Sequence, residues 1–136
     1  MKIYFAGSIR GGRGDKVFYD KIISLLKAYG TVLTEHVGDS NLTSTGEKLS
    51  DVEIHDRDMN WIIQSDIFVA EVSNPSLGVG YEISAAISLN KKIYCLYRVG
   101  AKNKLSAMIS GSKSIKLIKY NDIDILSKKF NNFLKI

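Results

Sequence analysis

The residue that could carry chemistry in this chain is Glu82, at the end of the segment NPSLGVGYE (residues 74–82). The nearly all-apolar run DIFVA (residues 66–70) precedes this segment and predicts a strand buried on both faces. Apolar residues continue after Glu82 at helical spacing. A strand that turns through a glycine-containing loop into a helix leaves unpaired backbone N–H groups and the positive end of the helix dipole at the loop. Such a loop favours an anion.

Glu82 can be interpreted in two ways. In or near the first turn of the predicted helix, the dipole and nearby N–H donors should hold its carboxylate ionised, and an ionised carboxylate at the rim of a pocket can act as a nucleophile. Alternatively, Glu82 is only an acidic residue at a helix N-terminus, where its charge stabilises the helix.

A second segment that suits an anion follows the first predicted strand. It reads GSIRGGRG (residues 7–14), with four glycines, two arginines and a serine. Backbone amides in a glycine-rich loop can approach a phosphate closely, and arginine is a suitable charge partner. The pattern is neither G-x-G-x-x-G nor a Walker loop, so it indicates an anion rather than a dinucleotide. A plain surface turn is the alternative interpretation.

Asp58 is a second candidate acid. The capping-box pattern SDVE (residues 50–53) opens a helix that we expect to continue to about residue 64. Along this helix His55, Asp58 and Ile62 lie on one side. Asp58 has apolar neighbours in the sequence, which would limit its contact with water, although it could equally lie on the polar face of a surface helix.

These residues must be positioned by a sheet, because predicted strands alternate with predicted helices along the chain. The strands are expected at residues 2–6, 31–34, 66–70, 92–97 and 115–120, and the helices at about 16–29, 51–64, 77–89 and 122–134. This alternation predicts an α/β fold of the three-layer, flavodoxin-like (Rossmann-like) type, with a five-stranded parallel sheet in the order 2-1-3-4-5. The 136 residues fit one domain, residues 1–136.

This strand order brings the two anion-binding segments together. The chain reverses direction between strands one and three, so a ligand crevice opens outside the carboxyl ends of these strands. The loops at that point are residues 7–14 and 73–80. Tyr4, near the end of the first strand, would point its phenol toward the crevice, where it can hydrogen-bond the Glu82 carboxylate.

The combined residues favour a phosphorylated sugar as the ligand. Glu82 and Asp58 would supply two carboxyl groups, and Ser8, Arg10 and Ser76 an anion cradle. Two carboxylates about 5 Å apart are the arrangement of retaining glycosyl chemistry, in which one attacks the anomeric carbon and the other assists the leaving group or the water.

Composition excludes several other classes. No apolar run approaches the roughly 18 residues that a membrane span needs, and the N-terminus lacks a signal-peptide pattern, so a cytoplasmic protein without membrane contact is predicted. Cys95 stands alone inside an apolar run and is expected to be a buried structural thiol. With only His36 and His55 and no paired cysteines, no zinc site is expected. The net charge of +5 suits an anionic ligand, but the lysines are spread out, so nucleic acid is not a predicted partner.

One long polar segment, residues 38–50, is expected to be a loop. Loops of about this length are uncommon without a purpose, so it could cover a pocket. A connector without a role is the alternative.

Several motifs in the same order resemble the 2'-deoxynucleoside 5'-phosphate N-hydrolases, a family of the nucleoside 2-deoxyribosyltransferase superfamily. They are YFAGSIRGGR (4–13), TVLTEHV (31–37), HDRD (55–58), VAEV (69–72), PSLGVGYE (75–82) and LSAMI (105–109). The resemblance runs from the first strand to the loop before the fifth. Residues 38–50 and the last helix carry little of it.

The resemblance implies hydrolysis of the N-glycosidic bond of a deoxynucleoside 5'-monophosphate to free base and 2-deoxyribose 5-phosphate. Glu82 matches the nucleophile that forms a glycosyl-enzyme intermediate, Asp58 the acid that positions the sugar and helps protonate the base, and Tyr4 the phenol beside the nucleophile. These three are the predicted catalytic residues.

The resemblance also implies the residues that bind substrate. Those that match the phosphate- and sugar-binding loops are Ser8, Arg10, Gly11, Ser76 and Gly78. Ile9 and His36 match wall residues for the base. Ser106 matches a serine that reaches the phosphate from the neighbouring subunit, which implies a homodimer with shared sites. No metal or organic cofactor is expected.

Three other functions are consistent with these residues. A deoxyribosyltransferase would use the same nucleophile to exchange bases between nucleosides, although Ser8, Arg10, Ser76 and Ser106 favour a substrate with a 5'-phosphate. A ribonucleotide N-glycosidase would use the same chemistry on a different sugar. A nucleotide-binding module without turnover is the alternative outside enzymes, since many flavodoxin-like domains are of that kind.

Overall fold

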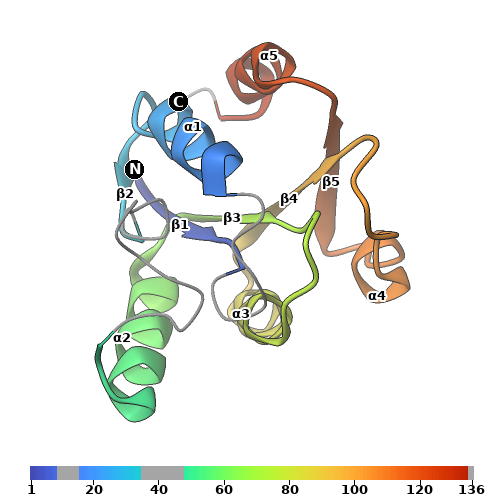
Figure 1. Cartoon of the computed structure of the whole chain (residues 1–136). Coiled ribbons are helices and arrows are strands. Elements are labelled where there is room, and N and C mark those ends of the chain that lie inside the picture. Colours follow the sequence, from blue (N-terminus) through green and yellow to red (C-terminus); the bar gives the residue numbers. More distant parts are fainter. Residues whose placement is uncertain (9–15, 35–47, 135–136) are drawn as a thin grey trace.

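The fold is a five-stranded parallel sheet between two layers of helices (Figure 1). The computed structural model describes residues 1–8, 16–34 and 48–134. The strands are β1 (Lys2–Ala6), β2 (Thr31–Val32), β3 (Ile67–Glu71), β4 (Lys92–Arg98) and β5 (Ile115–Tyr120). The helices are α1 (Lys16–Leu26), α2 (Asp51–Gln64), α3 (Leu77–Ser88), α4 (Ala107–Ser110) and α5 (Ile123–Phe133). The strand order is β2-β1-β3-β4-β5, which confirms the predicted fold class and topology.

All strand pairs are parallel, so the carboxyl ends of the strands lie at one edge of the sheet. Ile3 of β1 pairs with Ile67 of β3, and Ala6 pairs with Ala70. The chain therefore leaves β1 and β3 side by side. The segments that follow these two strands, which the sequence suggested as anion-binding loops, begin next to each other.

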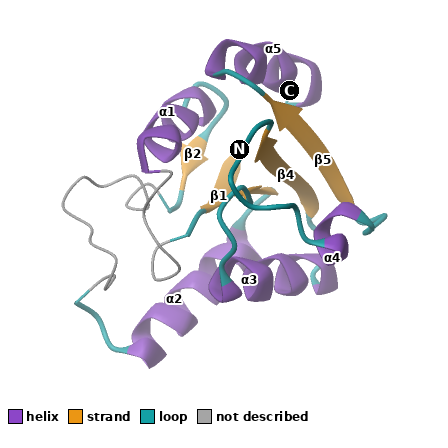
Figure 2. Cartoon of the chain, turned by 45° about the vertical axis from the view of Figure 1, so that its right-hand side comes forward, coloured by secondary structure: helices purple, strands orange, loops and turns teal. Residues whose placement is uncertain are grey.

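The two faces of the sheet are covered by different helices (Figures 1 and 2). One hydrophobic cluster joins α1 and α5 to alternate strand residues such as Phe5 and Val69. The other cluster joins α2 and α3 to the intervening strand residues, such as Tyr4 and Phe68, whose side chains point to the opposite face of the sheet. Because side chains alternate along a strand, Tyr4 points toward α2 and α3. Burial of both faces explains why the strands read as apolar runs.

The local signals in the sequence explain most helix ends. In α2 the Ser50 Oγ accepts a hydrogen bond from the Glu53 N–H at 3.2 Å, and the Glu53 carboxylate accepts one from the Ser50 N–H at 3.4 Å, which forms the predicted capping box. Helix α1 ends at Leu26, earlier than the predicted limit near Tyr29, because the last turn tightens. There the Tyr29 N–H donates to the Leu26 carbonyl three residues back, at 2.9 Å.

Strand β2 is shorter than predicted. It contains only Thr31–Val32, whereas the apolar and β-branched pattern suggested a strand to Thr34. The reason lies in the Thr34 side chain, which is buried. Its Oγ1 accepts a hydrogen bond from the Phe5 N–H at 2.7 Å and donates one to the Phe5 carbonyl. A side chain thus replaces the backbone ladder at this point and holds the end of β1.

No helix in the described ranges is long and apolar enough to cross a membrane. The predicted buried thiol is confirmed: Cys95 is free and fully buried on β4, and burial raises its pKa to about 12.

Replacement of Thr34 by valine tests its part in the fold. Thr34→Val should lower the free energy of unfolding by about 1–3 kcal/mol, because the buried Phe5 N–H and carbonyl lose their partner. Thr31→Val, at an exposed position of β2, is the matched control and should change stability little. Urea denaturation measures both variants. Equal stabilities for the two would contradict the structural role given to Thr34.

Candidate active site

The candidate site is a cavity of about 1420 Å³ at the carboxyl edge of the sheet. Its walls come from Gly7 after β1, the helices α2 and α3, the β3–α3 loop (residues 72–76), and residues 104–112. The β3–α3 loop and Gly7, the first residue of the other loop that the sequence suggested, therefore line one cavity, whereas residues 9–14 lie outside the described residues.

Glu82 and Tyr4 form the centre of the site. Tyr4 is buried in the middle of β1, where its ring stacks on Phe68 with the centroids 5.2 Å apart. Its hydroxyl donates a hydrogen bond of 2.7 Å to the Glu82 Oε2, as predicted. Glu82 lines the cavity from α3, whereas Tyr4 lies beneath it. The rigid, stacked phenol thus holds one carboxylate oxygen in place and leaves the other directed to the cavity.

The ionisation of Glu82 differs from the prediction. The sequence suggested a carboxylate held ionised by the helix dipole, but the pKa of Glu82 is raised from 4.5 to about 7. Burial is the largest cause, and the hydrogen bond from Tyr4 opposes it. Glu82 is the sixth residue of α3, which starts at Leu77, so it lies in the second turn and beyond the free N–H groups of the first.

Charges from α2 also act on this pair. Asp58 raises the pKa of Glu82, and Arg57 lowers it. For Tyr4, burial raises the pKa most, followed by the negative charges of Glu82 and Asp58, so the phenol stays protonated and remains a donor.

Asp58 lines the same cavity as Glu82. It lies on the predicted helix, one turn before Ile62, which packs against the sheet. The Arg57 guanidinium contacts the Asp58 Oδ1 with two nitrogens, at 2.9 and 3.0 Å, and stacks on the Trp61 ring at 4.7 Å. Only 20% of the Asp58 side chain is exposed. Asp58 is therefore half-buried at the cavity wall, which favours the interpretation of it as a site residue over that of an ordinary residue on a solvated face.

One end of the cavity, at the start of α3, suits an anion. Ser76 caps this helix and accepts a hydrogen bond from the Val79 N–H at 3.3 Å. A Cβ on Gly78 would lie 3.8 Å from the Ser76 Oγ and 3.9 Å from the Glu82 Oε1, so the absent side chain leaves open the space between them. An anion that approaches the first turn of α3 would meet free backbone N–H groups.

Ser8 is the residue next to Gly7, which lines the cavity. Ser8 is fully buried, and its backbone N–H donates to the Tyr19 hydroxyl at 3.0 Å. Its Oγ has no hydrogen-bond partner within residues 1–8, 16–34 and 48–134. Four predicted substrate-binding residues, Ile9, Arg10, Gly11 and His36, lie outside the described residues, as does most of the polar segment 38–50.

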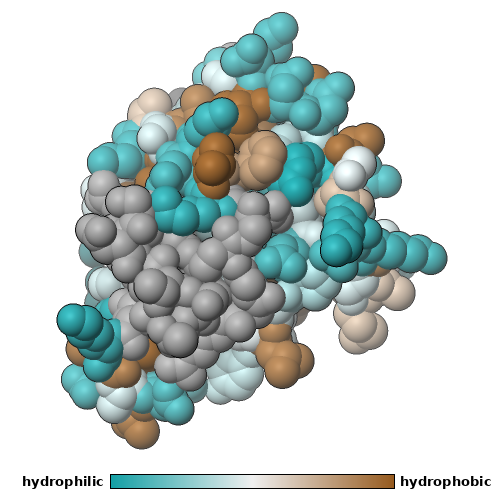
Figure 3. Space-filling model, in the orientation of Figure 1, coloured by the Kyte–Doolittle hydropathy of each residue, from teal (hydrophilic) through white to brown (hydrophobic). Residues whose placement is uncertain are grey.

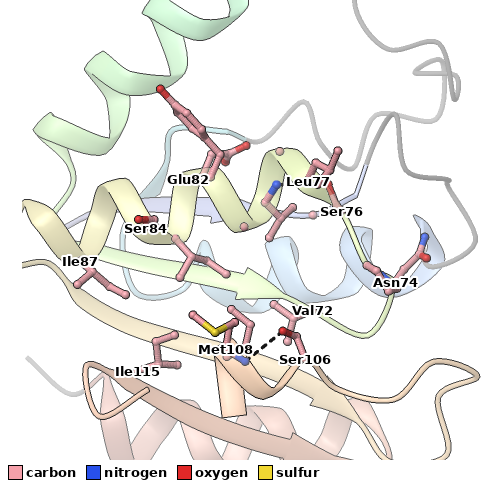
Figure 4. Close-up of a pocket in the computed structure, with 18 of the residues that line it drawn as sticks. Val72, Asn74, Ser76, Leu77, Glu82, Ser84, Ile87, Ser106, Met108 and Ile115 are labelled. Carbon is pink, nitrogen blue, oxygen red and sulfur yellow. Dashed lines mark hydrogen bonds between the residues drawn. The ribbon is translucent and has the colours of Figure 1, made fainter. Parts of the chain in front are cut away.

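Ser106 lines the cavity at its far end, as the N-cap of α4. Its Oγ accepts a hydrogen bond from the Met108 N–H at 3.2 Å. Figure 4 shows that Glu82 lies on one side of α3, whereas Ser106 and Met108 lie on the other. The cavity extends along both sides of this helix, and Ser106 does not come together with the Tyr4–Glu82 pair of its own chain.

Sequence reasoning missed Arg57 and the pair formed by His55 and Tyr81 at the cavity wall. The His55 Nε2 lies 3.1 Å from the Tyr81 hydroxyl, and both residues line the cavity. Arg57 stands inside the HDRD motif next to Asp58, and its spacing of four residues from Trp61 was the signal that could have indicated a fixed guanidinium. Over the described part of the chain, no three His, Cys, Asp or Glu side chains gather so as to hold a metal ion.

Comparison with known proteins decides the family. The sequence model described as nucleoside 2-deoxyribosyltransferase matches residues 3–128. The chain belongs to this family. The match covers nearly all of the fold and includes Tyr4, Asp58, Glu82 and Ser106, and it confirms the resemblance suggested by the sequence motifs.

Two relatives are similar over most of their length. A protein of Danio rerio named 5-hydroxymethyl-dUMP N-hydrolase is 52% identical over 123 residues, which cover 90% of this chain and 86% of the relative. A protein of Tetraodon nigroviridis with the same name is 53% identical over 114 residues, which cover 82% of this chain and 80% of the relative. Among solved structures, the CMP N-glycosidase of Clostridium botulinum has the same fold, with a TM-score of 0.68 at 19% identity over 98% of this chain and 99% of that chain.

The hydrogen bond between Tyr4 and Glu82 can be tested by titration. Tyr4→Phe should raise the pKa of Glu82 above about 7, by roughly one to two pH units, because a hydrogen bond to the charged form is lost. NMR of the side-chain carboxyl carbon, assigned with Glu82→Gln, measures the midpoint. Tyr97→Phe is the control, since the Tyr97 hydroxyl bonds the Asn103 carbonyl outside the cavity. An unchanged Glu82 midpoint in Tyr4→Phe would contradict the proposed coupling.

Proposed function

We propose that this chain hydrolyses the N-glycosidic bond of 2'-deoxynucleoside 5'-monophosphates and releases free base and 2-deoxyribose 5-phosphate. The observation that carries the proposal is the half-buried Glu82 carboxyl, which is hydrogen-bonded by Tyr4 and lines a cavity that Asp58 also lines. Two relatives of this chain, at 52% and 53% identity, are named for N-hydrolysis of a deoxynucleotide, which supports the proposal.

The reaction follows from the roles that these groups can take. The ionised Glu82 attacks C1' of the sugar, and the base leaves with the electron pair of the C1'–N bond and takes up a proton with help from Asp58. Water then attacks C1', the ester bond to Glu82 breaks, and the carboxylate is regenerated. The proton from water passes to Asp58 or to solvent.

The remaining residues bind the substrate. Ser76, Gly78 and the first turn of α3 surround the 5'-phosphate, and the Ser8 Oγ, which has no partner among the described residues, suits the same anion. Arg10 and Gly11 complete this cradle, and Ile9 and His36 contact the base, as the family resemblance implies. Arg57 keeps Asp58 oriented and adds positive charge beside Glu82.

The direct test is incubation with deoxynucleoside monophosphates, including 5-hydroxymethyl-dUMP, followed by chromatography for free base. Glu82→Gln should lower kcat by at least about a thousandfold while nucleotide binding stays within a few-fold, because the nucleophile is lost and the phosphate contacts remain. Ser88→Ala, at an exposed position of the same helix that does not line the cavity, is the control. Base release by Glu82→Gln at the wild-type rate would rule out the mechanism.

Base exchange is the second candidate function, because the family model is described as a transferase. Adding a second free base to the same incubation distinguishes hydrolysis from base exchange. Hydrolysis yields 2-deoxyribose 5-phosphate whether or not the second base is present, whereas exchange yields a new nucleoside or nucleotide only when it is present. A ribonucleoside monophosphate in the panel tests the choice of sugar.

A homodimer with shared sites is part of this proposal. Leu77 and Met108 are 96% and 82% exposed beside the cavity, and Tyr81 is also exposed. Figure 3 shows a few apolar side chains at the surface in the region of α3 and α4, as well as others near α1, α5 and α2. Contact of these helices with a second copy would cover this surface. Since Ser106 lies across α3 from its own Glu82, it would serve the site of the partner. Cytoplasmic location stays a prediction from the sequence.

Complementation between two variants tests the shared site. Glu82→Gln and Ser106→Ala should each be impaired alone, but their coexpression should restore about a quarter of the wild-type rate. Half of randomly paired dimers are mixed, and each mixed dimer has one site with both native residues. If the turnover rate of the coexpressed chains is only the mean of the rates of the two separate variants, Ser106 acts in its own chain.

A further inference from the structure

Glu71 is a buried acidic residue that the proposed reaction does not use. It is the last residue of β3 and has no exposed surface. By the alternation of side chains it lies on the same face as Val69, toward α1 and α5, whereas Glu82 reaches the opposite face. A buried carboxyl is costly unless it is hydrogen-bonded, so the groups around Glu71 indicate why it is there.

The Glu71 carboxyl joins the start of the β3–α3 loop to the neighbouring strands. Its Oε1 accepts a hydrogen bond of 2.6 Å from the Ser73 N–H, and its Oε2 accepts one from the Tyr120 hydroxyl of β5. The Ser73 Oγ in turn accepts a hydrogen bond of 2.8 Å from the Arg98 N–H of β4. Ser73 is thus held through its backbone by β3 and through its side chain by β4, and Tyr120 of β5 in turn holds Glu71.

The position of Ser73 is passed on to the cavity by a short, stiff segment. Pro75 fixes its own φ and restricts Asn74 to extended conformations. Ser76 is also extended, with φ −151° and ψ 126°, and it caps α3. Asn74, Pro75 and Ser76 all line the cavity. A shift of Ser73 would therefore move Ser76 and the first turn of α3 rather than be absorbed between them.

We propose that Glu71 is a positioning residue for phosphate binding: through Tyr120 and Ser73 it fixes the β3–α3 loop so that Ser76 and the first turn of α3 meet the 5'-phosphate. The Arg98 guanidinium, which stacks on Phe18 of α1 at 4.0 Å, closes the same cluster from the β4 side. The inference rests on the proposed function for the identity of the phosphate group.

The test compares phosphorylated and unphosphorylated ligands in Glu71→Gln and Tyr120→Phe. Calorimetry measures the binding of inorganic phosphate and of 5-hydroxymethyl-2'-deoxyuridine, and kinetics measure KM and kcat for 5-hydroxymethyl-dUMP. Phosphate binding should weaken and KM should rise by about tenfold, the effect of one lost buried hydrogen bond, while kcat and nucleoside binding stay within about twofold. Ile118→Val, two residues before Tyr120 on the same face of β5, is the control for a packing defect alone.

Each outcome supports or overturns the inference. The inference is overturned if the variants lose phosphate binding and nucleoside binding equally, or if neither variant loses phosphate binding. It is also overturned if the wild-type chain does not bind phosphate. If Glu71→Gln does not fold, Tyr120→Phe decides, because it removes a single hydroxyl. Phosphate-selective loss of binding in a chain that releases no base from any nucleotide would refute the proposed function and leave the role of Glu71 standing. Base release by the wild-type chain, combined with equal losses of phosphate and nucleoside binding in the variants, would support the proposed function and refute the role of Glu71.

Discussion

The hydrogen bond from Tyr4 to Glu82 is the interaction on which the site depends. It joins a rigid, buried phenol in the middle of the sheet to a half-buried carboxyl on α3. Burial favours the protonated form of Glu82 and the hydrogen bond favours the ionised form, and the balance leaves a carboxyl with a pKa of about 7. Such a carboxyl is less solvated than an ordinary surface glutamate, and it is still ionised in part near neutral pH.

The two faces of the sheet contribute differently to this site. The face toward α2 and α3 carries the groups of the proposed reaction, because Tyr4 and Glu82 meet there and Asp58 lines the same cavity from α2. The face toward α1 and α5 carries the buried Glu71–Tyr120 contact, which holds the loop that leads into α3. Consecutive residues of β3 point to opposite faces, so this strand contacts both the cluster that anchors the loop and the cluster that packs under Glu82.

Helix α3 has a similar double role. Its N-terminal turn provides N–H groups for an anion, its second turn carries Glu82, and its far side faces Ser106 and Met108 (Figure 4). The exposure of Leu77 and Met108 beside this cavity is costly in a lone chain and is explained if a second copy covers them. In the proposed dimer, the same contact would bring Ser106 of one chain toward the site of the other.

Much of the fold and part of the site could be predicted from the sequence, because their signals are local. Apolar runs separated by helical periodicity indicated the five strands and their order, SDVE gave the capping box of α2, and the position of Tyr4 near the end of a strand beside the Glu82 loop gave their hydrogen bond. The motifs from YFAGSIRGGR to LSAMI indicated the family. Each of these rests on neighbours in the sequence or on the few rules that govern parallel sheets.

Only the tertiary structure decided the properties that depend on groups distant in the chain. The helix dipole suggested an ionised Glu82, but its pKa reflects burial by the sheet and by α2, which no local pattern encodes. The early end of β2 follows from the contact of Thr34 with Phe5, and the burial of Glu71 is made possible by a hydrogen bond from a tyrosine 49 residues later. Solvation and hydrogen bonding of a side chain are set by what folding brings next to it, so these features become visible only once the strands are paired.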